Sequence, residues 1–309
     1  MKLSVLGEKE IISRLGSFLN VSDDAACVRH GGEYLVLSTD MMHQKTHVLP
    51  GMSWEQIGAF IVSVNVSDIA AMGARPVAFL MACGLPRSME YADLDRMLRA
   101  AEAQCERYGA KYVGGDTKEA RDMTLSGFCM GRTKRPVHRS GARKGDIVAV
   151  TGDFGAASLG VTLLLSGIRE KGDRAALQKA VAPCARVGEG LLIGRYANSL
   201  TDTSDSLATC LHDIASASGV GMTIDEDMIP IAPATRRLAE KLGLSAVDCA
   251  LGGGGDYELV YTVPKGAFFR IRKKIETTQI GRVGGEGIFL ESSDGSRKRL
   301  EKTGYEHFK

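Results

Sequence analysis

The chain has 309 residues, 44% of them hydrophobic, and a formal net charge of +2. This length allows a substantial core in two domains or one large domain, and the near-neutral charge excludes the broad basic surface of a general nucleic-acid binder. No apolar run approaches the ~20 residues of a membrane span, and the amphipathic, partly acidic segment 1–15 is unlike a signal peptide, so we expect a cytoplasmic protein with neither membrane nor nucleic acid as a partner.

The first half of the chain alternates predicted strands and helices. Both predicted helices end at a glycine, which is a common helix C-cap. The stretch AKYVGGDT predicts a short strand that runs into a glycine turn. We expect a strand-rich first unit that closes near residue 138, with strands at 34–39, 77–85 and 123–133 and helices at 53–73 and 89–109.

A second unit follows a polar, basic connector at 134–146, whose default interpretation is a solvated loop. A strand is predicted at 146–152, followed by a small-residue loop and an apolar helix. The segment 203–219 is the clearest helix of this half, with apolar residues on one face and Gly219 at its end. A strand at 256–263 follows four consecutive glycines. These elements predict two domains, at 1–137 and 138–309.

The most informative feature is a set of aspartates that stand beside small or turn-forming residues. Each one alone is more commonly a turn or cap residue. If they converge, however, their repulsion requires protonation or cations, and hard oxygen ligands select Mg²⁺ or Mn²⁺. The seven cysteines are scattered and lack CxxC spacing, which argues against disulfides and a zinc site. The sequence thus predicts a polyphosphate site built from Asp23, Asp24, Asp40, Asp68, Asp116, Asp202 and Asp205.

Asp68 is the strongest of these candidates. Together with Ile57, Ile61 and Val64 it follows helical spacing, which places its carboxylate on the face that should be buried. A buried charge needs a cation or a donor network. None of the glycine-rich stretches ends in the GK[ST] of a P-loop, so we expect metal ions and arginine to neutralise phosphate charge.

Ten ordered stretches carry a resemblance to one family. They are SDDAA, LSTDMM, NVSDIAAMGARP, LP at 85–86, GGDT, RSGARKGDIVAVTG, TDTSDSLA, GGGGDYEL, IGRV at 280–283 and GYEHF. The chain resembles thiamine-monophosphate kinases, whose superfamily also contains aminoimidazole ribonucleotide synthetase and selenophosphate synthetase. The resemblance implies an α/β (α+β), two-domain synthetase-like fold, in which strands of the N-terminal domain form a barrel across a homodimer and an α/β C-terminal domain completes the active-site cleft.

The resemblance also implies the reaction and the residues that perform it. ATP would phosphorylate thiamine monophosphate directly, with Mg²⁺ ions gathering the two anions, and Asp68, Asp205 and Arg139 would act in catalysis. Substrate contacts are implied for His47 and Tyr305, and ATP contacts for Gly115, Asp116, Arg139 and Ser204. The implied metal ligands are Asp24, Ser38, Thr39, Asp40, Asp68, Asp116, Asp202 and Asp205.

Three departures from the family pattern fall on the acceptor side. Gly255 stands where the family usually has a glutamate that contacts the substrate, Ser206 replaces a usual glycine, and QKTHV keeps His47 but loses its usual flanking residues. Glu258 is a candidate to replace the missing acid. The alternatives are a paralogue that acts on another anionic acceptor, or a nucleotide-binding assembly factor with little turnover.

Overall fold

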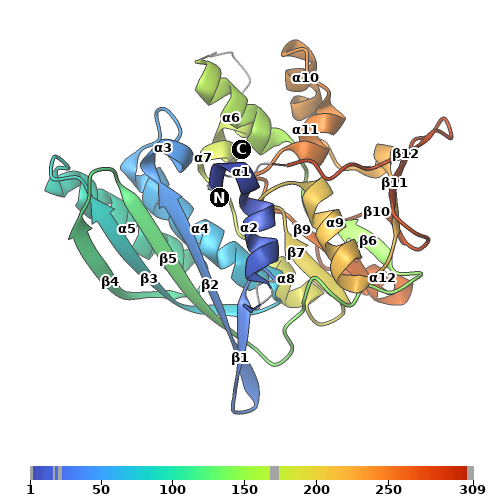
Figure 1. Ribbon diagram of the computed structural model, residues 1–309, viewed down its shortest axis with the longest axis horizontal. Coiled ribbons are helices and arrows are strands. Elements are labelled where there is room, and N and C mark those ends of the chain that lie inside the picture. The colour runs from blue at the N-terminus through green and yellow to red at the C-terminus, as the bar shows by residue number, and fades with distance from the viewer. Residues whose placement is uncertain (1–2, 17, 20–22, 168–173, 305–309) are drawn as a thin grey trace.

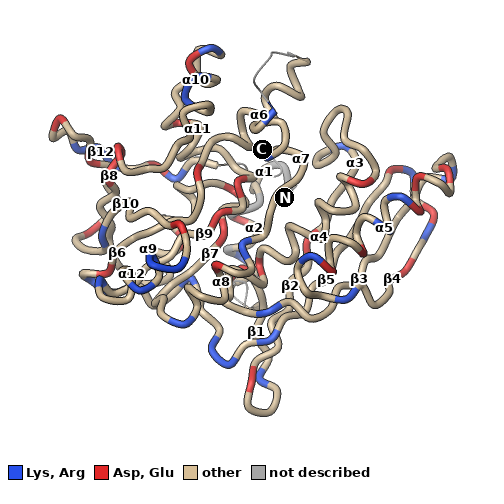
Figure 2. The backbone as a smooth tube through the Cα atoms, turned by 180° about the vertical axis from the view of Figure 1, so that it is seen from behind, with Lys and Arg blue, Asp and Glu red and all other residues tan. Residues whose placement is uncertain are grey.

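The computed structural model describes residues 3–16, 18–19, 23–167 and 174–304. It is a mixed α/β structure with two separate sheets, which lie on the left and right of Figure 1. None of the helices in these ranges combines the length and the apolar character that a membrane span requires. Basic and acidic residues are interspersed over both halves (Figure 2), as the near-neutral charge suggests.

The first sheet has the strand order β1-β2-β5-β3-β4 and does not close on itself. Its strands pair antiparallel, except for β3 and β4, which are parallel. The predicted strands at 34–39, 77–85 and 123–133 are confirmed. The observed strands are β1 (Ala26–His30), β2 (Glu33–His43), β3 (Arg75–Leu85), β4 (Lys111–Glu119) and β5 (Thr124–Thr133).

One prediction in this sheet is wrong, because β4 does not stop at a glycine turn but runs through both glycines of GGD. The pairing register of β3 and β4 shifts between Phe79, which pairs with Tyr112, and Leu80, which pairs with Gly114. A Cβ at Gly115 would lie only 1.8 Å from the Met81 carbonyl oxygen, so glycine permits the close approach of the two parallel strands here.

Two long helices cover one face of this sheet, α4 (Trp54–Ala71) and α5 (Tyr91–Arg107), as predicted for 53–73 and 89–109. Ser53 and Gln56 form a capping box at the start of α4. This helix is buried almost all round because it also packs on the second half of the chain. Gly190 of α8 (Val187–Ile193) lies against it so closely that a Cβ would be 2.4 Å from the Ala70 carbonyl oxygen. The helix α4 therefore holds the two halves together.

The second sheet has the strand order β12-β11-β8-β10-β6-β9-β7. The predicted strands at 146–152 and 256–263 are confirmed as β6 and β9, although β9 starts only at Leu259. The strands are β6 (Ile147–Val150), β7 (Ser199–Asp202), β8 (Met222–Asp225), β9 (Leu259–Val263), β10 (Thr278–Val283), β11 (Ile288–Glu291) and β12 (Arg297–Arg299).

Several helices surround this sheet, and among them α9 confirms the helix predicted at 203–219. The amphipathic helix predicted at 1–15 is broken at Gly7, which has a φ of 75°. All seven cysteines are free thiols. Besides α8, the remaining helices are α1 (Leu3–Leu6), α2 (Glu8–Leu15), α3 (Gln44–His47), α6 (Ala156–Ser166), α7 (Arg174–Val181), α9 (Leu207–Ser218), α10 (Pro233–Lys241), α11 (Ala246–Gly252) and α12 (Lys265–Arg272).

Candidate active site

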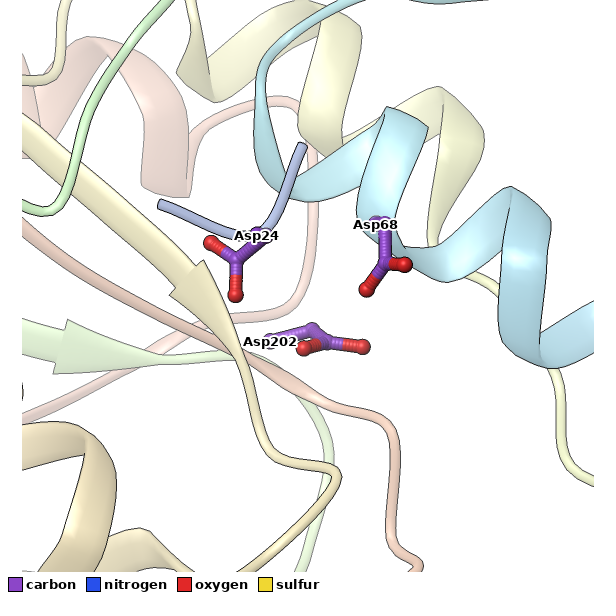
Figure 3. A group of neighbouring side chains, drawn as sticks. All are labelled: Asp24, Asp68 and Asp202. Carbon is purple, nitrogen blue, oxygen red and sulfur yellow. The ribbon is translucent and has the colours of Figure 1, made fainter. Parts of the chain in front are cut away.

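Three carboxylates converge where the two halves of the chain meet. Asp24 comes from the loop before β1, Asp68 from the C-terminal part of α4, and Asp202 from the end of β7. One carboxylate oxygen from each lies within 4.8 Å of the others, and Figure 3 shows the three side chains pointing toward one another. The convergence predicted for these aspartates is therefore present, and it joins residues from both halves of the chain.

Polar side chains from α4 and β2 hold this cluster in place. Ser67, next to Asp68, donates to the Asp202 carboxylate, and Ser38 on β2 donates to the Asp68 carboxylate. The side-chain oxygen of Asn65 accepts a hydrogen bond from the Asp40 amide at 2.9 Å. The helix α4 thus presents polar residues to the site at the end of an otherwise apolar run, a pattern that spacing revealed for Asp68 but not for Asn65 or Ser67.

Arg139 reaches into the cluster from the basic connector. Its Nη2 donates to Asp24 Oδ1 at 2.5 Å, and the same oxygen accepts from Thr201 Oγ1 at 2.9 Å. The neighbouring Asp23 accepts from the Arg139 amide at 2.8 Å and pairs with His138 Nδ1 at 2.8 Å. The default interpretation of this connector as a solvated loop is therefore wrong at Arg139, whose side chain is only 25% exposed.

The cluster leaves polar atoms unsatisfied. Asp24 Oδ2, Asp202 Oδ1 and Arg139 Nε are buried and have no hydrogen-bond partner among the residues that the structure describes. A buried carboxylate oxygen without a donor is costly, and a coordinated cation would remove that cost. Oxygen ligands without histidine or cysteine suit Mg²⁺, so the residues present fit the ion that the sequence predicted.

Burial and mutual repulsion raise the pKa values of these carboxylic acids. Burial, followed by the charges of Asp24 and Asp205, raises the pKa of Asp40 to about 6. Burial and the charge of Asp24 raise the pKa of Asp202 to about 8. Burial and the charges of Asp40, Asp202 and Asp24 raise the pKa of Asp68 well above its usual value. The folded protein therefore disfavours the fully ionised cluster in the absence of a cation.

This arrangement predicts how metal-free stability depends on pH. Between about pH 4 and pH 8 the folded protein binds more protons than the unfolded chain, because the pKa values of Asp40 and Asp202 are raised only in the folded state. The contribution of these two carboxyl groups to stability is thus greatest below this window and is lost as the pH rises through it. We expect the melting temperature in a chelator to be lower at pH 8 than at pH 5, and Asp202→Asn to reduce this difference. An unchanged or higher melting temperature at pH 8 would contradict the expectation.

Tyr257 borders the cluster in a strained backbone conformation. Its φ of 50° is the only positive value at a non-glycine position in the described part of the chain. Burial, and the charges of Asp40 and Asp202, raise the pKa of its hydroxyl well above the usual value. Its ring meets Phe60 of α4 edge-on, with the ring centroids 6.4 Å apart. Such strain commonly marks a functional site, and no pattern in the residues around Tyr257 predicted it.

Three predicted positions are not part of this cluster in the single chain. Asp116 is exposed on β4 at the edge of the first sheet, where it accepts from Lys118 Nζ and the Thr117 amide, both at 2.9 Å. Gly115 precedes it on the same strand, and β5 and β3 separate both from β2. The Thr39 hydroxyl donates to the Gly127 carbonyl at 2.8 Å instead of joining the carboxylates. Their predicted roles in metal and ATP binding remain predictions.

The other predicted positions lie around the cluster or outside the described residues. Asp205 stands between β7 and α9, and its charge contributes to the raised pKa of Asp40. Ser204 is exposed, and its carbonyl accepts from the Gly255 amide at 2.8 Å. His47 ends α3, where its Nδ1 accepts from the His43 amide at 3.3 Å. Tyr305 falls outside the described residues.

Glu258 does not replace the acid that is missing at Gly255. Its side chain is 1% exposed and accepts hydrogen bonds from Thr151 Oγ1 at 2.8 Å and from Arg186 Nε at 2.7 Å. Lys179 Nζ lies 3.3 Å from the same carboxylate. The hypothesis that Glu258 serves the acceptor is therefore wrong, because this carboxylate is already occupied by an internal ion-pair network.

Comparisons with known proteins agree with this geometry. Residues 22–133 match the family described as AIR synthase related protein, N-terminal domain. The chain is 38% identical to a thiamine-monophosphate kinase of Pyrococcus horikoshii over 94% of this chain and 91% of the relative. It is 34% identical to that of Aquifex aeolicus over the full length of both. The chain belongs to the thiamine-monophosphate kinase family.

Solved structures show that the similarity to this family extends over the whole fold. A structure described as AaThiL complexed with AMPPCP and TMP superposes with a TM-score of 0.92, at 34% identity and with 99% of each chain covered. A hydrogenase maturation protein HypE in complex with ATP superposes with a TM-score of 0.73 at 22% identity, which shows a shared fold only. Because the first of these structures covers 99% of the chain, both halves of the chain share its fold.

Proposed function

We propose that this chain transfers the γ-phosphoryl group of ATP to thiamine monophosphate. The observation that carries the proposal is the cluster of Asp24, Asp68 and Asp202, with its unsatisfied buried oxygens, in a chain that superposes along its length on a relative complexed with AMPPCP and TMP. A terminal oxygen of the acceptor phosphate forms a bond to the γ-phosphorus as the bond to the β–γ bridging oxygen breaks. The products are thiamine diphosphate and ADP.

Asp24, Asp68 and Asp202 would hold Mg²⁺, with Asp40, Asp205 and Ser38 close to them. The bound ions supply charge neutralisation for the phosphate groups that are brought together. Arg139 would bind the nucleotide phosphates, because its guanidinium lies at the cluster beside Asp24. Its Nε has no hydrogen-bond partner among the described residues and could donate to a phosphate oxygen. Ser204, Gly115 and Asp116 are further proposed nucleotide contacts.

We also propose that the chain forms a homodimer through its first sheet. Within the described ranges both edges of this sheet are open, at β1 and β4, and the face away from α4 carries exposed apolar side chains. Met41 on β2 is 60% exposed and Leu80 on β3 is 37% exposed. A second copy on this face would complete the barrel implied by the resemblance, and it could bring its own GGD strand toward the carboxylate cluster.

Light scattering is expected to give twice the chain mass of 33.0 kDa at micromolar concentration. Leu80→Asp should yield a monomer because it places a charge in the apolar interface, whereas Leu165→Asp, at a 67% exposed position on α6, should leave the dimer intact. A monomeric wild-type protein would count heavily against the dimer.

The function itself is tested by ADP release in the presence of Mg²⁺. We expect turnover with thiamine monophosphate and none with thiamine, which has no phosphate oxygen to act as the nucleophile. Gly255 carries no acid, and the Glu258 carboxylate is held by Arg186 and Thr151. The assay should therefore include other anionic acceptors. Turnover with one of these alone would identify a paralogue, and the absence of turnover with every acceptor would favour a nucleotide-binding assembly factor.

Restoring the acid at Gly255 is expected to have two opposing effects. Gly255 has a φ of +87°, so any side chain is strained there, at ~1–2 kcal/mol of stability. A Cβ would otherwise meet only the Ala157 Cβ at 3.6 Å, so the new side chain has room. Gly255→Glu and Gly255→Ala should lower the melting temperature equally. Only the glutamate variant should lower the KM for thiamine monophosphate, by up to ~10-fold for a contact of ~1.4 kcal/mol. Equal KM values for the two variants would show that position 255 does not contact the acceptor.

A further inference from the structure

The C-terminal segment Leu300–Gly304 is fastened along α9 by side chains of that helix and its cap. His212 Nε2 lies 2.9 Å from the Leu300 carbonyl oxygen. The ammonium group of Lys302 pairs with Asp213, which also lies 3.7 Å from Arg139 Nη1. The Thr303 carbonyl accepts from the hydroxyl groups of Ser206 and Thr209. The segment is therefore held at three successive points.

Ser206 is the point of attachment nearest the active site. It directly follows Asp205, is fully buried, and caps α9 by accepting a hydrogen bond from the Thr209 amide at 3.0 Å. Its hydroxyl hydrogen remains available for the Thr303 carbonyl. The fit is tight, because a Cβ at Gly304 would lie 2.8 Å from Ser206 Oγ and 2.7 Å from Thr209 Oγ1. Any side chain at position 304 would therefore force the Ser206 and Thr209 side chains to shift.

The fastened segment lies beside the stretch that lacks the usual acid. A Cβ at Gly252 would lie 3.2 Å from Thr303 Oγ1, and a Cβ at Gly254 would lie 2.4 Å from the Asp205 carbonyl oxygen. The Gly255 amide donates to the Ser204 carbonyl at 2.8 Å. The turn 203–206, the glycine stretch 252–255 and the segment 303–304 thus pack against one another next to Asp205.

We propose that Ser206 is a positioning residue for the acceptor: its hydroxyl fixes the C-terminal segment against α9 beside Asp205 and so raises the affinity for the acceptor. The inference rests on the proposed function for the identity of that acceptor. A segment that is already fixed does not have to be ordered when the substrate binds, whereas a loose segment does, and that ordering weakens binding. This attachment acts on the side of the site where Gly255 carries no side chain.

Ser206→Gly tests the inference, since glycine is nearly as good as serine at a helix N-cap and the variant should fold. Trypsin cleavage after Lys302, followed by mass spectrometry of the released 303–309 peptide, reports how firmly the segment is held. We expect Ser206→Gly to cleave about 5-fold faster than the wild type and to raise the KM for thiamine monophosphate about 5-fold, with the KM for ATP unchanged, as the loss of one hydrogen bond implies. Ser206→Thr keeps the hydroxyl and should be cleaved at the wild-type rate, although its added methyl group, at a fully buried position, should lower the melting temperature.

Ser245→Gly is the matched control, because Ser245 caps α11 by the same kind of bond to Asp248, at 3.1 Å, without touching the C-terminal segment. It should change neither the cleavage rate nor the KM. An unchanged cleavage rate in Ser206→Gly would overturn the attachment, and faster cleavage with an unchanged acceptor KM would overturn the positioning role. A wild-type protein that releases no ADP with thiamine monophosphate would contradict the proposed function instead, and the cleavage rates would still decide whether Ser206 holds the segment.

Discussion

Asp68→Asn is expected to lower kcat about 100-fold or more while the protein remains folded. Asp68 lies in a cluster whose carboxylate oxygens are within 4.8 Å of one another, and burial and its neighbours raise its pKa well above the usual value. Asparagine keeps the shape but removes the charge and a strong metal ligand. Loss of one ligand from a metal that contributes several kcal/mol to the transition state corresponds to this change in rate.

The same substitution should leave metal-free stability unchanged or increase it, since the ionised cluster repels itself in the folded state. Steady-state ADP release gives kcat, and calorimetry in a chelator gives the melting temperature. Asp95→Asn is the control: it also removes one carboxylate from a helix, but Asp95 forms only a surface pair with Arg99 at 2.7 Å. Wild-type turnover by Asp68→Asn at ordinary Mg²⁺ concentrations would refute the metal-cluster interpretation.

The elements and the carboxylates that converge were predictable because they leave local signals. Helical spacing places Asp68 on the buried face of α4, and the observed helix differs from the predicted one by only one residue at its start and two at its end. Asp24 and Asp202 stand beside small, turn-forming residues near the ends of strands, where side chains from different elements can meet. Family motifs then indicated which of these ends meet.

The partners of those carboxylates left no local signal. Thr201 and Arg139 both bond Asp24 although they lie 177 and 115 residues away from it in the chain. Such pairs depend on how the two halves pack, and periodicity contains no information about that. Strand alternation was likewise insufficient for Glu258, because the residues before β9 are irregular and the side chain turns toward Arg186.

Glu258→Gln is expected to lower the free energy of unfolding by about 2–3 kcal/mol. The carboxylate is almost fully buried and is shared by Arg186, Lys179 and Thr151, so its neutral replacement leaves two cations without their main counter-charge. Breaking a fully buried pair costs ~3–5 kcal/mol, and we expect less here because the two cations are 28% and 29% exposed and remain partly solvated. Urea denaturation measures the change.

The surface residue Glu291 provides the control for this prediction. It pairs with Arg282 at 3.3 Å and with Arg297 at 3.5 Å, and its side chain is 33% exposed, so Glu291→Gln should cost less than ~1 kcal/mol. Equal losses in the two variants would show that burial does not strengthen the Glu258 network. If Glu258→Gln loses more stability than Glu291→Gln, we also expect it to lower kcat for ADP release. Arg186 stands at the start of α8, and α8 packs against the end of α4 that carries Asp68.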